Sequence, residues 1–354
     1  MQKRYFILGC SFVFVMLIGQ IHAIAQDNVV LGISQMVTLA VSNNAQFKKA
    51  GYQLENTKLE AKRMEAENWL NESTISDLQK RATLLNQQNQ FQLEKDQLLV
   101  KVVDDYFRIK MAEKDIESKQ KNTELEEIVL AGVKEQVAAG YSVDLDLLQQ
   151  GNKYYNALFS FQRSELDYQQ LQMEVKDRLG IDHDKRIVLS DMSIPDFPER
   201  SLRDSLDKTL QNSFILQSHD IRIKIAEREL KAAKANDLPD IEILRLENNL
   251  GIAKLDKSMS EEELAYQVET QWLNYNQAKN DILISRRNLR QMEENRDLIF
   301  RQVQAGLRNR EDSLSADIGV VDAQSRLISS VRQVYQAYLE LEKMMGTLNE
   351  GVLK

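Results

Sequence analysis

The chain has 354 residues, of which 13 are glycine and 3 are proline, and its formal net charge is −8. Average globular chains hold roughly 7% glycine and 5% proline, so turns are expected to be few here and helices long. Charged residues make up 28% of the chain with both signs interspersed, which is typical of solvated helices, and the lack of a basic block excludes nucleic acid as an expected partner.

The first 25 residues are typical of a secretory signal peptide. Two basic residues precede an apolar run that ends at Gly19, and the small residues that follow predict cleavage after Ala25. An uncleaved membrane anchor is the alternative, although the run is shorter than the roughly 20 residues that a bilayer needs. Cys10 follows a lipoprotein-like ILG, but a lipoprotein box belongs at the end of the apolar stretch, which here continues for nine more residues.

No catalytic, cofactor or metal site is expected in the mature chain. Cys10 is the only cysteine, so cleavage leaves no thiol and no disulfide. His183 and His219 lie 36 positions apart without a metal-binding spacing, which favours ordinary surface or interface histidines. The acidic residues stand among basic ones at helical spacing, as on a solvated face. The sequence therefore predicts a protein that is not an enzyme and binds no cofactor.

Residues 94–139 predict one long helix with coiled-coil packing. Apolar residues recur there at multiples of seven, a period typical of helices that wind around each other. Such a helix would run about 45 residues, or roughly 68 Å. The positions of the series are Val102, Ile109, Ile116, Thr123, Leu130 and Val137.

The stretch QVAAGYSVDLDLLQQ at 136–150 predicts the tip of a helical hairpin. Gly140 directly follows the periodic run, and a new apolar pattern begins at Leu145. A glycine in this place is typical of a helix that ends in a left-handed cap before the next helix starts.

The tip occurs twice. The stretch QVQAGLRNREDSLSA at 302–316 repeats it at an offset of 166 residues, and residues 102–180 match 268–346 at that offset without a gap. Earlier parts correspond at an offset of 169, so a three-residue insertion or deletion separates the two registers. Recurrence at a fixed offset indicates two copies of one structural unit.

We therefore expect a mainly α fold made of two tandem helical units. The first unit is 26–180 and the second is 201–354. The linker between them, 181–200, holds two of the three prolines, and proline interrupts helices. Two interpretations of the repeated tips stay open: they form a partner surface, or the repeat only preserves turn chemistry, with Asp146 and Asp312 as acids at helix starts that the helix dipole favours.

These features together resemble the TolC family of outer-membrane efflux channels. The resemblance rests on the two tandem units, the signal peptide, the opening LAVSNN at 39–44, the repeated tips of the form Gly-x-x-x-x-x-Asp, and KAAKANDLPDIEI at 231–243, which is similar to the family's passage from helix to strand. It covers residues 34–349.

The resemblance implies a homotrimer located in the outer membrane and facing the periplasm. Each protomer of such a trimer supplies four strands to a barrel and long helical hairpins to a periplasmic tunnel. A periplasmic adaptor and an inner-membrane pump dock at the tips, which here correspond to Gly140, Tyr141, Gly306 and Leu307.

The resemblance also assigns a gate. An acid six residues after the second tip glycine forms a ring that constricts the entrance, and this position is Asp312. The family's next acidic ring falls on Ser315, so a second ring is not expected. A lock between protomers joins an aspartate of the first tip to an arginine of the second, and these positions are Asp146 and Arg308.

Barrel strands are short or missing in this sequence. A spanning strand needs about 9 to 11 residues. The polar segment 71–99 shows no lipid-facing side, and 241–264 has room for one hairpin around Asn248-Asn249 with strands of only about seven residues. At most short β-hairpins are therefore expected where the family has barrel strands, with strand content at or below a tenth.

Two functions follow from these observations. The favoured one is an export conduit component, a trimeric helical tunnel for efflux or secretion of small molecules or proteins, whose strands are minimal or supplied by another subunit. The alternative is a barrel-less coiled-coil scaffold protein of the periplasm. The tip acids and the lock positions favour the conduit, because a purely structural rod has no need of them.

Overall fold

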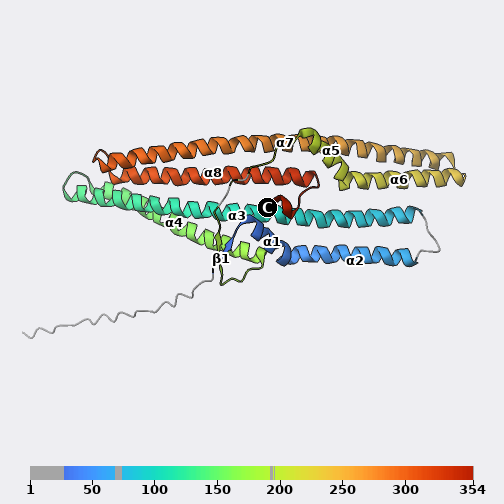
Figure 1. Cartoon of the computed structure of the whole chain (residues 1–354), viewed down its shortest axis with the longest axis horizontal. Helices are drawn as coiled ribbons and strands as arrows, with labels where there is room; N and C mark the ends of the chain where they lie inside the picture. Colours follow the sequence, from blue (N-terminus) through green and yellow to red (C-terminus); the bar gives the residue numbers. More distant parts are fainter. Residues whose placement is uncertain (1–27, 68–73, 192–193, 195, 354) are drawn as a thin grey trace, which may run out of the picture.

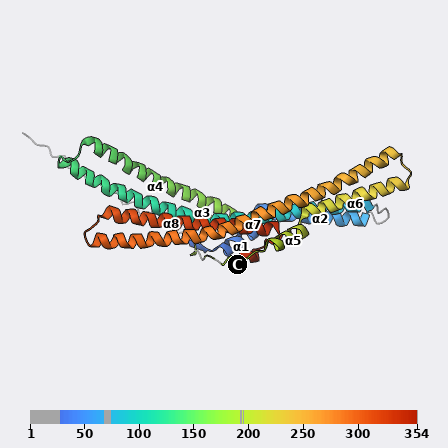
Figure 2. The ribbon, with the colours of Figure 1, turned by 90° about the horizontal axis from the view of Figure 1, so that it is seen from above.

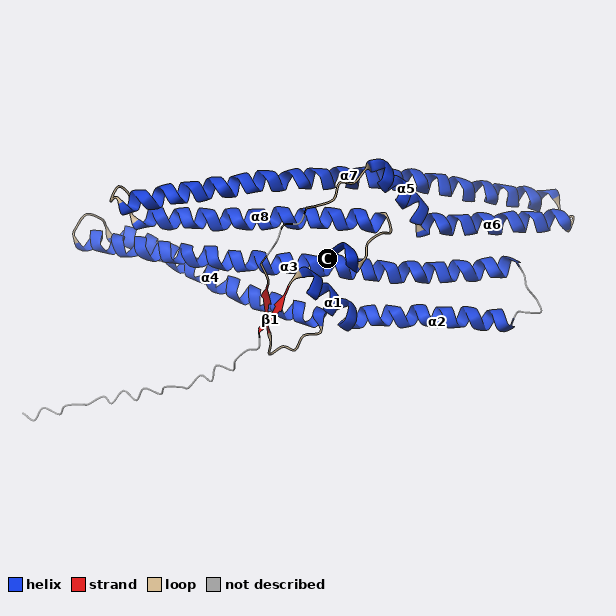
Figure 3. Ribbon diagram, in the orientation of Figure 1, coloured by secondary structure: helices blue, strands red, loops and turns tan. Residues whose placement is uncertain are grey.

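The computed structural model describes residues 28–353 except 68–73, 192–193 and 195. The expected signal peptide and its cleavage site lie outside these residues. The described chain forms a long rod of helices with a small two-stranded sheet near its middle (Figures 1 and 3). None of the described helices combines the length and the apolar character needed to cross a lipid bilayer.

Four helices recur in the same order in the two halves of the chain. Their lengths are 11, 23, 65 and 36 residues in the first half and 11, 22, 65 and 35 in the second. The expected fold class, mainly α with two sets of long helical hairpins, is confirmed, while the unit boundaries remain our proposal. The helices are α1 (Ile33–Asn43), α2 (Ala45–Glu67), α3 (Thr74–Ala138), α4 (Asp144–Leu179), α5 (Leu202–Asn212), α6 (Phe214–Ala235), α7 (Asp240–Gln304) and α8 (Arg310–Met344), and a short 3₁₀ helix, η1 (Glu350–Leu353), follows.

The two longest helices, α3 and α7, run the length of the rod, and each has two successive partners (Figure 1). α3 packs against α4 over one half and against α2 over the other, and α7 does the same with α8 and α6. The contact of α3 with α8 joins the two halves of the chain. The α3–α4 and α7–α8 turns lie together at one end of the rod, with separate tips when seen from above (Figure 2), and the α6–α7 turn lies at the other end.

The structure extends the expected helix at 94–139 toward its N-terminus. α3 begins at Thr74 and has 65 residues, not about 45. The stretch before residue 94 is polar and lacks the seven-residue period, but it contains neither glycine nor proline and is rich in leucine and glutamine, which are strong helix formers. Helix propensity and packing against α2 carry the helix through it.

No strand hairpin forms around Asn248-Asn249, because α7 is continuous from Asp240 to Gln304, and this agrees with the expectation of at most short β-hairpins. The passage at 231–243 likewise leads from helix to helix, with a turn whose Asp237 has a φ of 51° and whose Pro239 precedes α7. The two asparagines suggested a turn, but α7 contains no proline, and its first half packs along α6. Burial of one face along a neighbouring helix outweighs a local turn preference.

The only strands in the described residues are β1 (Asn28–Leu31) and β2 (Arg186–Leu189), which pair in parallel with Val29 opposite Ile187. Strand content thus stays below the expected tenth in this part of the chain. Gln172 of α4 closes the free edge of β2, because its Oε1 accepts from the Ile187 N–H at 3.1 Å and its Nε2 donates to the Ile187 carbonyl at 2.9 Å. A side-chain amide thereby takes the place of a third strand.

The core lies near the middle of the rod, where the two halves meet. The ring of Phe107 on α3 lies 5.1 Å from that of Tyr335 on α8, and Phe197 of the linker packs edge-on against Tyr335 at 5.0 Å. The Tyr275 hydroxyl of α7 donates to the Pro198 carbonyl at 2.7 Å. The linker is therefore packed against α7 and α8 through an aromatic ring and a backbone carbonyl.

Each half is closed by an asparagine and a glycine. The Nδ2 of Asn43, at the end of α1, donates to the Leu179 carbonyl in the last turn of α4 at 3.0 Å. Gly180 follows with a φ of 65°, and a Cβ added there would lie 2.8 Å from the Asn43 Cβ. The glycine thus permits both the left-handed cap and the close approach of α1. The second half repeats the arrangement with Asn212, Met345 and Gly346.

Replacing Gly180 with alanine is expected to lower the free energy of unfolding by about 1 to 3 kcal/mol, because the left-handed backbone and the Asn43 contact both oppose a Cβ. Gly132→Ala is the matched control: Gly132 lies inside α3 with nothing within 4 Å of an added Cβ. There the change should stabilise the protein by roughly 0.5 to 1 kcal/mol. Urea unfolding of both variants measures the difference, and equal effects of the same sign would contradict the role given to Gly180.

Candidate docking site at the hairpin tips

The first tip joins α3 to α4 through a left-handed glycine. Gly140 has a φ of 77°, its N–H donates to the Val137 carbonyl at 3.0 Å, and the Tyr141 N–H donates to the Gln136 carbonyl at 2.8 Å. This pair of bonds closes the end of α3 and turns the chain outward. The expected helix end at Gly140 is confirmed.

The second tip has the same backbone geometry. Gly306 has a φ of 72°, its N–H donates to the Val303 carbonyl at 3.0 Å, and the Leu307 N–H donates to the Gln302 carbonyl at 2.9 Å. A Cβ added at either tip glycine would meet nothing within 4 Å, so glycine is needed for the dihedral angle and not for space. The repeated sequence therefore encodes the same cap twice.

Both tips present a large apolar side chain to solvent directly after the glycine. Tyr141 is 87% exposed and Leu307 is 77% exposed. The first tip continues this surface with Val143 and Leu145, which are also exposed. A turn favours small or polar residues at these positions, so turn formation does not explain an exposed tyrosine and an exposed leucine. This surface is therefore a candidate for contact with another protein.

Asp146 lies in the first turn of α4 and caps that helix. Its carboxylate accepts from the Ser142 hydroxyl and, at 3.3 Å, from the Val143 N–H. These two hydrogen bonds lower the pKa of Asp146. Within a single chain, the acid thus serves the helix start, which is the simpler of the two interpretations drawn from the sequence.

Asp312 takes the equivalent place at the start of α8. Its N–H donates a capping bond to Oδ1 of Asn309 at 2.9 Å, and its Oδ1 lies 3.7 Å from Nη1 of Arg308. Arg308 therefore pairs with the acid of its own tip, and the described part of the chain shows no ion pair between Arg308 and Asp146. The positions expected for a lock are present, but one chain alone does not bring them together.

The structure adds one tip residue that the sequence reasoning missed. Arg310, the first residue of α8, lies with Nη2 2.7 Å from Oε1 of Glu124 on α3, so this pair ties the two hairpins to each other. The available signal was a charge reversal within the repeat, because Arg310 falls opposite Asp144 at the offset of 166. Both partners are exposed, so the pair contributes only about 0.2 to 1 kcal/mol and positions the tips more than it stabilises them.

No protein-family model matches the sequence, and no curated protein matches it. Solved structures do match. The chain superposes on the CmeC outer membrane channel of Campylobacter jejuni with a TM-score of 0.66 and 10% identity, over 89% of this chain and 85% of that one. For the open state of the MtrE outer membrane channel of Neisseria gonorrhoeae the TM-score is 0.61 and the identity 13%, over 90% and 91%. For the outer-membrane channel OprN they are 0.59 and 11%, over 89% and 90%.

This chain has the fold of TolC-like outer-membrane channels. The resemblance seen in the sequence is thereby confirmed at the level of the fold. Identities of 10% to 13% do not carry an activity from those channels to this chain, so function must be argued from the tips and surfaces of the TolC-like fold itself.

Proposed function

We propose that this chain is the subunit of an export conduit, in which three copies stand side by side as a helical tunnel for small molecules or proteins. The tunnel lies in the periplasm and reaches the outer membrane, and each subunit is secreted with a signal peptide that is cleaved after Ala25. The role is transport, and no catalytic step or cofactor is assigned. The fold shared with outer-membrane channels supports this proposal.

One observation carries the proposal: two helices leave a coiled-coil seam uncovered. On α4 and on α7, exposed apolar side chains recur at intervals of seven along one face. A seven-residue apolar stripe marks the face by which a helix packs against a partner helix. Because these stripes point away from the chain's own core, further copies of the chain are the partners that we assign to them. The stripe residues are Phe159, Leu166 and Met173 on α4, and Ile252, Met259, Tyr266 and Leu273 on α7.

The assembly has a direct test. The mature chain is expected to have the mass of a trimer in native mass spectrometry, and Met259→Glu combined with Tyr266→Glu should dissociate it by placing charges in the seam. Lys254→Glu is the control, because Lys254 is also exposed on α7 but lies roughly 120° to 140° around the helix from Met259 and Tyr266. A monomeric native chain, or a trimer that survives the double substitution, would sink the proposal.

The tips are the proposed docking site for a periplasmic adaptor and an inner-membrane pump. They end the two long hairpins, they lie together at one end of the rod (Figure 1), and they expose Tyr141 and Leu307 next to the capping glycines Gly140 and Gly306. Tyrosine is enriched among the residues that carry the binding energy at the centres of protein interfaces, so Tyr141 is the main anchor that we assign to this site.

We assign the gate to the acids and the arginine of the tips. In the trimer, three copies of Asp312 form the entrance constriction, and Arg308 exchanges its 3.7 Å contact with Asp312 for Asp146 of a neighbouring copy. Each exposed pair contributes only about 0.2 to 1 kcal/mol, so loss of one pair loosens the entrance and does not unfold it.

A ring of three carboxylates should bind divalent cations. Calcium at 100 times its Kd is expected to stabilise the trimer by about 2.7 kcal/mol, and Asp312→Asn should abolish this gain. Asn309 still caps the helix in that variant, because the bond runs from the backbone N–H of residue 312. Calcium titrations followed by thermal unfolding provide the measurement, with Glu311→Gln as the control from the same turn. Equal stabilisation of native and Asp312→Asn trimers would refute the ring.

One observation favours a second function, a periplasmic scaffold protein. The segment 241–264, to which the resemblance assigns membrane strands, lies within the helix α7. A rod of this kind would connect partners at its two ends without conducting anything. Fractionation separates the two functions: recovery of the mature chain in the soluble periplasmic fraction favours the scaffold, and extraction as a trimer from membranes favours the conduit.

A further inference from the structure

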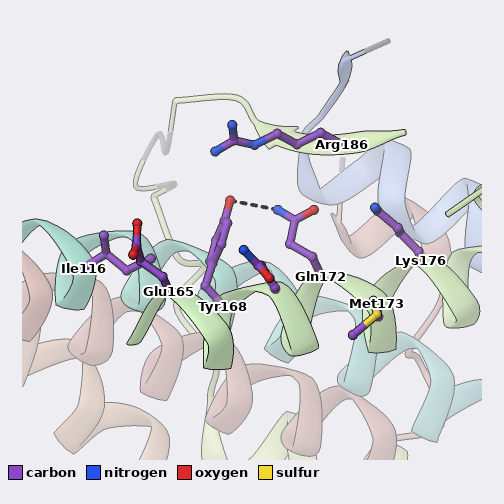
Figure 4. Close-up of a pocket in the computed structure, with 8 residues that line it drawn as sticks. Ile116, Glu165, Tyr168, Gln172, Met173, Lys176 and Arg186 are labelled. Atoms are coloured by element: carbon purple, nitrogen blue, oxygen red, sulfur yellow. Dashed lines mark hydrogen bonds between the residues drawn. The ribbon is translucent and has the colours of Figure 1, made fainter. Parts of the chain in front are cut away.

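A pocket of about 550 Å³ lies between α4 and β2, away from the tips (Figure 4). Glu165, Tyr168, Gln172 and Lys176 line it from α4 at a spacing of three or four residues, and Arg186 reaches over it from β2. Its volume falls within the range of small-molecule sites. Two of the lining residues are cations whose charges the chain itself leaves unmatched.

Lys176 is the first of these cations. It is only 6% exposed, and its Nζ donates to the backbone carbonyl of His183 at 3.0 Å. The carbonyl accepts from one of the three N–H groups of the Lys176 ammonium and does not neutralise its positive charge. Within the described part of the chain, no carboxylate forms an ion pair with Lys176. A buried ammonium is unfavourable unless an opposite charge accompanies it, so Lys176 offers a binding point for an anion.

Arg186 is the second cation. Its guanidinium lies over Tyr168 in Figure 4 and interacts with that hydroxyl, and among the described residues it has no carboxylate partner either. A guanidinium presents a planar fork of N–H groups that matches the two oxygens of a carboxylate. Gln172 lies between Lys176 and Arg186 in the figure, so the two cations offer two separate binding points.

The other polar groups of the pocket are already satisfied or stand apart. The side-chain amide of Gln172 forms hydrogen bonds with the backbone of Ile187, and its Nε2 also donates to the Tyr168 hydroxyl at 2.8 Å. Glu165 would repel an anion; it lies eleven residues before Lys176, about 16 Å along the helix axis, but only three residues before Tyr168, over which Arg186 lies. The stretch of the pocket from Arg186 to Lys176 is therefore its positive part, and Glu165 bounds it on the far side of Arg186.

We propose that this pocket binds a pair of carboxylates, one at Lys176 and one at Arg186. The pair has two possible sources with the same chemistry, a free dicarboxylate or two acidic side chains of a neighbouring copy. The second source rests on the proposed assembly and is compatible with the position of Met173, which lines the pocket and also belongs to the exposed stripe of α4.

The test uses succinate as the probe and the mature chain in two forms, the native assembly and the Met259→Glu, Tyr266→Glu variant. Calorimetry is expected to show succinate binding to at least one form, with acetate and neutral succinamide at least tenfold weaker. Arg186→Gln and Lys176→Gln should each weaken binding at least tenfold. Lys185→Gln should not weaken binding, because Lys185 directly precedes Arg186 but does not line the pocket, and it pairs with Asp182 at 3.4 Å.

The two sources give different results. Binding to both forms identifies a free dicarboxylate, whereas binding to the dissociated variant alone, together with weaker assembly of Arg186→Gln, identifies acidic side chains of another copy. Arg186 is exposed, so its replacement leaves the fold intact. If neither form binds succinate, or if both cation variants bind it as the native chain does, the proposal is overturned. If the native chain is a monomer, the proposed assembly is rejected, but the succinate titrations still test the proposed pocket.

Discussion

Replacing Asp105 with alanine is expected to lower the free energy of unfolding by about 3 kcal/mol, the largest effect among single substitutions considered for this chain. Asp105 is 1% exposed in the interior of the α3–α4 pair. Its carboxylate lies 3.1 Å from Nε of Arg178, 3.2 Å from Nη1 of Arg108 and 3.6 Å from Nζ of Lys101. Burial raises the pKa of Asp105, and the three cations oppose that rise.

The expected loss of stability in Asp105→Ala arises from the cations that remain without a partner. Lys101 keeps a contact with Asp104 at 3.7 Å and Arg108 keeps one with Glu174 at 3.6 Å, but Arg178 has no other carboxylate partner among the described residues. Removing one partner of a buried pair leaves a charge without compensation, whereas removing both is much milder. Asp105→Ala combined with Arg178→Met should therefore recover most of the loss.

Urea unfolding at neutral pH measures these free energies. Asp115→Ala is the matched control, because Asp115 also stands on α3 and also pairs with a lysine, Lys119 at 2.7 Å, but its side chain is 51% exposed. That change should cost less than about 1 kcal/mol. A loss of the same size at both aspartates, or no recovery in the double variant, would show that the buried cluster does not act as described.

The parts of the fold that the sequence predicts are those with local causes. A seven-residue apolar period and the scarcity of glycine and proline predict the long helices, and each glycine that ends a periodic run predicts a cap that the structure confirms. The signal at Gly140 and Gly306 is local because the left-handed φ is a property of one residue. The repeat adds a second, independent copy of the same signal.

Other parts depend on contacts between distant residues, for which a single sequence gives no local sign. The pairing of β1 with β2 and the contact of Arg310 with Glu124 join segments far apart in the chain, and the hydrogen bonds of Gln172 to Ile187 join a helix to the strand that follows it. The helical conformation around Asn248-Asn249, where the sequence has room for a strand hairpin, also depends on a distant contact, because α7 packs against α6 there.

At the tips, the backbone geometry could be predicted from the sequence, whereas the ion-pair partners could not, and the role of the tips as a docking site stays a prediction. The tip glycines, the exposed residues after them and the acids at the helix starts all follow from the repeated sequence. The partner of Arg308 does not, since a residue four positions away competes with a partner on another hairpin. Local pairs form in the isolated chain at little entropic cost, and only assembly can offer the alternative.

A last expected result concerns pH and a second buried acid. Asp96 of α3 is 3% exposed and accepts a hydrogen bond from Nε2 of Gln92 at 2.8 Å. Burial raises its pKa from 3.8 to about 6, with a smaller contribution from Glu340, while the bond from Gln92 and the charges of Lys343 and Lys95 act in the opposite direction. The folded protein therefore binds a proton at Asp96 more tightly than the unfolded chain does.

The sign of the effect follows from this difference. The stability that Asp96 contributes is fully present below pH 3.8 and is lost as the pH rises through about 6. Asparagine keeps the oxygen that Gln92 bonds but cannot ionise, so Asp96→Asn should leave stability at pH 4 nearly unchanged and raise it at pH 8 by about 1 to 3 kcal/mol. Guanidinium unfolding at both pH values measures this gain. Asp115→Asn, at an exposed position of the same helix, should show no such pH-dependent gain, because its carboxylate remains in contact with water. If Asp96→Asn were no more stable than the native chain at pH 8, then the positive charge of Lys343 on α8 would have to compensate ionised Asp96, and the carboxylate would act as a structural ion.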